Sequence, residues 1–78
     1  NITREELAYM LYQYDGAPSD LTASLSGFSD SDQVSDWALD AMKYCVQKGI
    51  LQGSDGALNP QSTATRAEVA TMLTKFTA

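Results

Sequence analysis

The sequence of 78 residues contains no histidine, one cysteine and only five basic residues. Histidine is the most frequent general base and metal ligand, so its absence excludes every triad that needs an imidazole. The single Cys45 forms no disulfide within the chain, so no covalent bridge supports the thin core of so short a chain. No apolar run approaches the roughly 20 residues of a transmembrane helix. We expect neither an enzyme nor membrane insertion, and no cofactor is implied.

Acidic residues outnumber basic ones, and the formal net charge is −5. The stretch from residue 15 to residue 40 holds six Asp and no Lys or Arg. Such a surface repels anionic lipid, and the scattered basic residues form no patch of the kind that nucleic acid needs. Any anionic partner would therefore have to be held at a few specific points.

Three acidic residues, Asp30, Asp32 and Asp36, invite comparison with a calcium-binding loop. An EF-hand loop starting at Asp30 would need Gly at its sixth position and Glu at its twelfth. The sequence has Ser35 and Ala41 there. We interpret this stretch as a solvated acidic loop and predict no metal site.

Residues 2–14 and 64–76 form an internal repeat. The first segment reads ITREELAYMLYQY and the second ATRAEVATMLTKF, with six identities in thirteen positions at a constant offset of 62. A repeat of this kind indicates a tandem array. We expect the chain to hold the end of one repeat and the whole of the next.

Each copy predicts a helix that begins with a T-x-x-E capping box. Thr3 and Thr65 are the expected N-caps, with Glu6 and Glu68 three residues on. Apolar residues at i, i+3, i+4 and i+7 are expected to form the packed face of each helix. These residues are Leu7, Met10, Leu11 and Tyr14 in the first helix, and Val69, Met72, Leu73 and Phe76 in the second.

A third helix is predicted over residues 36–48, with Ser35 or Asp36 as its N-cap and Gly49 just beyond its end. Its expected apolar face consists of Trp37, Ala38, Ala41, Met42, Cys45 and Val46. Cys45 has no cationic neighbour and is interpreted as an inert core residue.

The segments between these helices are rich in turn-forming residues. Leu21 and Phe28 are expected to attach the acidic segment 17–34 to the helices. Residues 50–63 contain a Ser-Asp-Gly turn that supports at most a minimal β-hairpin. The predicted fold is therefore all-α, a small helical domain of three main helices with a turn-rich loop.

Arg4 and Arg66 each occupy the first position of a predicted helix, where a cation is unfavourable because of the helix dipole. One interpretation is an anion site, since a guanidinium and free N–H groups suit a carboxylate or phosphate. The other is an ion pair with a nearby acid that ties a loop to the helix.

Trp37 also allows two interpretations, since it begins its helix and lies close to the surface. Its ring is either a stacking platform for a sugar or the largest piece of a small core. The residues alone leave both open.

Several motifs, taken in order, resemble the S-layer homology domain. They are Phe28-Ser29-Asp30, Trp37-Ala38 with Ala41, Gly49-Ile50, Gly53, Asp55-Gly56, Pro60, and Thr65-Arg66-Ala67-Glu68 with Met72-Leu73. Residues 28–78 resemble one repeat, residues 1–16 the closing helix of a preceding repeat, and residues 17–27 the connection between them. Thr-Arg-Ala-Glu is the most diagnostic of these motifs.

The resemblance implies a module of a bacterial surface protein, located at the extracellular cell envelope. Family members usually carry three tandem repeats and attach proteins to cell-wall polysaccharide, often an acidic, pyruvylated one. The resemblance places ligand contacts on Arg66, with Arg4 in the partial copy, on Trp37, and on a loop with Gly53, Asp55 and Gly56. It implies adhesion, with neighbouring repeats as partners and a homo-oligomer as a substitute for missing ones. The rival hypothesis is a protein–protein or self-assembly module that binds no glycan.

Overall fold

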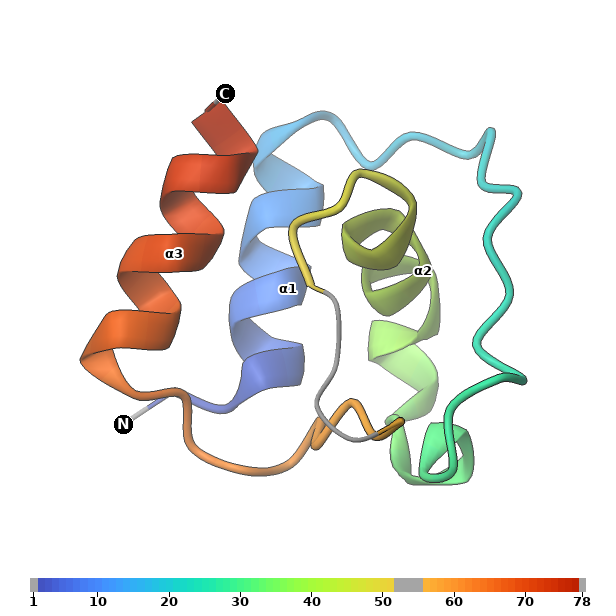
Figure 1. Ribbon diagram of the computed structural model, residues 1–78. Coiled ribbons are helices and arrows are strands. Elements are labelled where there is room, and N and C mark those ends of the chain that lie inside the picture. The colour runs from blue at the N-terminus through green and yellow to red at the C-terminus, as the bar shows by residue number, and fades with distance from the viewer. Residues whose placement is uncertain (1, 52–55, 78) are drawn as a thin grey trace.

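The computed structural model describes residues 2–51 and 56–77. Its main elements are the α-helices α1 (Arg4–Tyr14), α2 (Leu39–Gln47) and α3 (Arg66–Thr77), with the 3-10 helices η1 (Ser31–Gln33) and η2 (Asp36–Ala38) (Figure 1). The described residues contain no β-strand, and an isolated antiparallel bridge joins Thr3 to Thr63. The predicted all-α fold with three main helices is confirmed. No helix in this range is long and apolar enough to span a bilayer.

The predicted capping boxes are confirmed in α1 and α3. The Thr3 N–H donates to Glu6 Oε1 at 2.8 Å, and the Glu6 N–H donates to Thr3 Oγ1 at 3.2 Å. Thr65 and Glu68 form the same reciprocal pair at 2.8 and 3.1 Å. Both helices therefore begin where the repeat predicts.

The prediction of one helix over residues 36–48 is only partly correct. The segment starts as the 3-10 turn η2 and becomes α-helical at Leu39, and Ser35 makes no side-chain capping bond. The Ser35 hydroxyl instead donates to Glu5 of α1 at 2.7 Å, so a tertiary contact replaces the cap. Gly49 has a φ of 75°, as expected of a glycine that ends a helix in the left-handed region.

All three α-helices begin at the same end of the molecule, the lower end in Figure 1. The core lies mainly between α1 and α2, and Ile50, Leu51 and Leu58 close one side of it. Its fully buried members include Ala8, Ala38, Ala41, Met42 and Cys45. Small residues on α1 and α2 allow the two helices to approach closely.

The expected apolar faces of the repeated helices are partly wrong. Met10 is 59% exposed and Tyr14 84% exposed on α1, and Leu73 is 43% exposed on α3. In their place Ala8 and Tyr12 of α1 are buried, because α2 packs on a neighbouring face of this helix. Periodicity alone did not distinguish the face that meets α2 from the rest of the apolar surface.

The acidic segment between α1 and η1 crosses the molecule as an extended chain (Figure 1). Leu21 and Phe28 are half-buried against the core, as predicted, and Leu25 is fully buried. Gln47 at the end of α2 holds the segment, since its Oε1 accepts the Thr22 N–H at 2.7 Å. The turn of the predicted hairpin, residues 52–55, lies outside the described residues.

Candidate functional site

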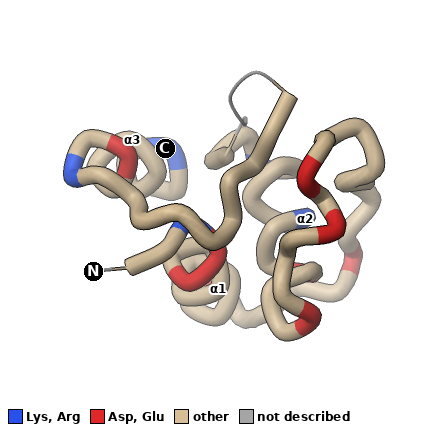
Figure 2. Tube along the Cα trace, turned by 90° about the horizontal axis from the view of Figure 1, so that it is seen from below, with Lys and Arg blue, Asp and Glu red and all other residues tan. Residues whose placement is uncertain are grey.

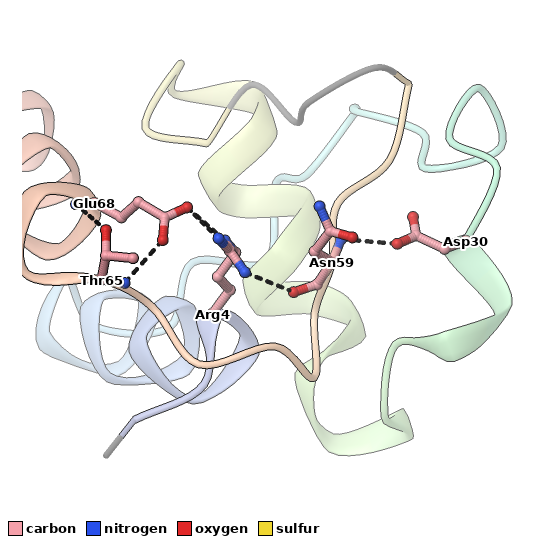
Figure 3. A network of polar contacts seen from close by, with 5 residues as sticks. All are labelled: Arg4, Asp30, Asn59, Thr65 and Glu68. Atoms are coloured by element: carbon pink, nitrogen blue, oxygen red, sulfur yellow. Dashed lines mark hydrogen bonds and ion pairs between the residues drawn. The ribbon is translucent and has the colours of Figure 1, made fainter.

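A polar network joins the start of α1 to the capping box of α3 (Figure 3). The Arg4 guanidinium donates to Glu68 Oε2 through Nε at 2.8 Å and through Nη2. Its Nη1 lies 3.5 Å from the Asn59 carbonyl oxygen. One carboxylate thus caps α3 and binds a cation that precedes it by 64 residues.

Asp30 extends this network to the acidic loop. Its two carboxylate oxygens accept the N–H groups of Leu58 and Asn59 at 2.8 and 2.7 Å. Partial burial tends to raise the pKa of Asp30, but these backbone bonds outweigh it and hold the pKa below its ordinary value. Both oxygens are therefore engaged by the fold.

The ion pair is the interpretation that the structure favours for Arg4. Its side chain is only 16% exposed and ties α1 to α3. The Thr65 N–H bond, followed by the Arg4 contact, lowers the pKa of Glu68, so the carboxylate stays charged in mildly acidic solution. A role of Arg4 toward a ligand stays a prediction.

A groove of about 390 Å³ lies beside this network. It is lined by Arg4, Ile50, Leu51, Leu58, Asn59, Ala67, Glu68, Thr71, Met72 and Lys75. Apolar and polar residues contribute equally to this lining, and the ion pair with Glu68 balances the charge of Arg4 there.

Trp37 lines a second, more open hollow of about 450 Å³, together with Ile2, Glu6, Tyr9 and Met10. The indole is 52% exposed, and the ring of Tyr9 meets it edge to face with centroids 5.4 Å apart. Trp37 is therefore not a core residue, contrary to its expected place on the buried face. A role of Trp37 as a stacking platform for a sugar stays a prediction.

Arg66 is exposed at the first position of α3, and the described residues offer its side chain no hydrogen bond or ion pair. It lines neither of the two hollows. The helices α3 and η2 begin at the same end of the molecule (Figure 1).

The predicted glycine-rich loop is seen only in part. Gly53 and Asp55 lie outside the described residues. Gly56 is exposed with a φ of 77°, and its carbonyl oxygen accepts the Ser29 N–H at 2.9 Å. This bond fixes the end of the loop against the acidic segment.

Charge is distributed unevenly around these features. Figure 2 shows several acidic residues on the side that holds α2 and the loop before it, while α3 on the opposite side carries two basic residues and one acidic residue.

Two polar contacts were missed by the sequence analysis. Glu5 is 5% exposed and accepts the Ser35 N–H at 2.9 Å, which fixes η2 and hence Trp37 against α1. Tyr44 donates to Asp15 at 2.8 Å. Burial and this bond raise the pKa of Tyr44 to about 12. The sequence carries no signal for either pairing, because the partners are 30 and 29 residues apart.

Cys45 is fully buried, as predicted. Burial raises the pKa of its thiol to about 12, so it stays protonated and unreactive at neutral pH. The described residues contain no cluster of acidic or cysteine side chains able to hold a metal.

Comparison with known proteins agrees with this architecture. The chain is 36% identical over 97% of its length to a Cellulosome-anchoring protein of Acetivibrio thermocellus, and 37% identical over the same share to Cell surface glycoprotein 1 of that bacterium. It spans 17% and 3% of these relatives. No solved structure matches it. The S-layer homology domain family matches residues 27–70. The chain therefore belongs to the S-layer homology domain family, whose place is the bacterial cell surface.

Proposed function

We propose that this chain is a non-catalytic module that attaches its parent protein to the cell wall by binding an acidic, pyruvylated secondary polysaccharide. Its family membership and its similarity to a protein named for anchoring support this function. The chain covers a small part of each relative, so the proposal concerns the module and not a whole protein.

The observation that carries the proposal is the exposure of Trp37. Leaving half of an indole in water forgoes a stabilisation of the order of 1 kcal/mol that a small core would gain from burying it. Tyr9 and the buried Glu5 nevertheless hold it at the surface. A fixed, exposed indole beside a hollow suits the C–H face of a sugar ring.

The acidic group of the glycan is assigned to Arg66. A pyruvate ketal carries one carboxylate, and an exposed guanidinium at a helix N-terminus supplies charge-assisted hydrogen bonds of about 1.5–3 kcal/mol to such a group. Arg4 is the second contact in this proposal, in the neighbouring groove where it is already paired with Glu68, and backbone groups around Gly53, Asp55 and Gly56 orient the sugar.

Sedimentation with purified cell walls tests this function. Trp37→Ala and Arg66→Ala should each weaken binding roughly tenfold, equivalent to about 1.4 kcal/mol. Tyr14→Ala, which removes another exposed aromatic residue, and Lys48→Ala, which removes another exposed cation, are matched controls. Walls stripped of their secondary polymer should bind none of the proteins. Equal binding by all variants, or binding to stripped walls, would refute glycan recognition.

A second candidate function is a protein–protein or self-assembly module. It is favoured by the exposure of Met10, Tyr14 and Leu73 on the two repeated helices. In this case residues 28–78 act as one repeat, 1–16 as the closing helix of another and 17–27 as their connection. Neighbouring repeats, or a second copy of the chain, would then cover the exposed faces. Light scattering across a concentration series detects such association.

A further inference from the structure

The contact between α1 and α3 joins the two repeated helices and is therefore a template for a further contact. Arg4 of α1 pairs with Glu68 of α3, and Tyr14 meets Phe76 edge to face with centroids 5.8 Å apart. Tyr14 and Phe76 occupy equivalent positions, 62 residues apart. Each helix thus packs on the other with one of its sides. Each also has a second side that is exposed, although the equivalent residues of the other helix lie in the contact.

The unused side of α1 matches the docked side of α3. On α3, Glu68 binds Arg4, and Met72 is 3% exposed. Their equivalents on α1 are Glu6, which is exposed, and Met10, which is 59% exposed. The α1 face formed by Glu6 and Met10 thus has the residues of a docked face, but no helix among the described residues covers it.

The unused side of α3 matches the buried side of α1 in the same way. Leu11 of α1 is 6% exposed, whereas its equivalent Leu73 is 43% exposed. Arg66, the equivalent of the ion-paired Arg4, is also exposed. The α3 face formed by Arg66, Ala70 and Leu73 therefore presents a cation and apolar surface to solvent.

We propose that these two faces bind each other between copies of the chain, with α1 of one copy on α3 of the next and Arg66 paired with Glu6. The partner is a second copy, because this chain carries both halves of the contact with opposite charges. This assignment rests on the second candidate function and not on glycan binding, because the neighbouring copy would occupy Arg66 and cover Glu6 and Met10 in the hollow beside Trp37. The two faces differ, so the contact is head-to-tail and leads to a ring or an open chain of copies rather than a two-fold dimer.

A charge exchange tests the pairing by sedimentation velocity over a concentration range. The wild type should associate, while Arg66→Glu should weaken association at least about tenfold because two glutamates then face each other. Lys48→Glu, an equal charge change at another exposed site, should associate like the wild type. Arg66→Glu places a favourable acid at the helix start, so folding is preserved.

The decisive experiment mixes two variants, each of which should associate only weakly by itself. In the Glu6→Arg protein two guanidinium groups meet at each contact, and in the Arg66→Glu protein two carboxylates meet. An equimolar mixture instead offers opposite charges at every contact between unlike variants. Association restored in the mixture supports the proposal. If the Arg66→Glu protein associated as strongly as the wild type, the pairing of Arg66 with Glu6 would be refuted. The copies would then associate through a different surface. If the wild type were monomeric at all concentrations, the proposal that a second copy is the partner would be refuted. The two faces would then be assigned to contacts with a neighbouring repeat.

Discussion

Glu68 and Glu6 offer a direct measurement of how strongly α3 is held to the rest of the molecule. Both cap a helix through the same reciprocal bonds to a threonine, but only Glu68 also binds Arg4. Replacing each with alanine removes one capping box from an equivalent position and changes helix propensity equally. The difference between the two variants therefore isolates the contact with Arg4.

The expected difference follows from these contacts. Glu6→Ala loses the cap alone and serves as the reference. Glu68→Ala also loses a partly exposed ion pair with two guanidinium bonds, so it should destabilise the fold by about 0.5–1 kcal/mol more than the reference. In a domain of this size each kcal/mol lowers Tm by about 4–8 °C. Urea denaturation followed by circular dichroism, at a concentration where the chain is monomeric, gives both free energies of unfolding.

A double-mutant cycle with Arg4→Gln completes the test. The coupling energy between Arg4 and Glu68 should be about 0.5–1 kcal/mol, and that between Arg4 and Glu6 close to zero. Equal destabilisation by the two alanine variants, with no coupling to Arg4, would contradict the claim that this pair attaches α3 to α1.

Two further predictions concern protonation. The folded-state pKa values of Glu68 and Asp30 lie below their ordinary values of 4.5 and 3.8, so the unfolded chain binds these protons more readily. Their contribution to stability is complete above the ordinary values and is lost as pH falls through the lower folded ones. The urea concentration at the unfolding midpoint should therefore decrease as the pH is lowered below about 4.5. This decrease should be less steep in a Glu68→Gln, Asp30→Asn double variant. The buried Cys45 thiol should resist a thiol reagent at about pH 8 and react at once in concentrated guanidinium, and rapid labelling of the folded chain would contradict its burial.

The parts of the fold that depend on local sequence could be predicted. A capping box involves residues three positions apart, so Thr3 and Thr65 identified the starts of α1 and α3. Gly49 marked the end of α2 for the same reason, since its left-handed conformation is local. The burial of Cys45 followed from its apolar neighbours at helical spacing.

The long-range pairings could not be predicted, because many acids were available to each cation and N–H group. Glu68 forms an ion pair with Arg4, and Asp30 accepts a hydrogen bond from the Leu58 N–H. The sequence separation of neither pair predicts the contact. The exposure of Met10 had a different cause. Its periodicity marks an apolar side of α1, but α2 packs on a neighbouring face and leaves Met10 exposed.

The core residues of α1 also bear on which segment of this protein folds as one cooperative unit. A cut before residue 28 would leave a complete repeat by sequence, yet it would remove Leu7, Ala8, Leu11 and Tyr12 from the core. If residues 28–78 are one repeat, as proposed, stability is shared across the repeat boundary, and we expect the smallest segment able to fold to straddle it. Exchange of repeats between proteins should therefore preserve folding only when each closing helix is transferred together with the repeat that follows it.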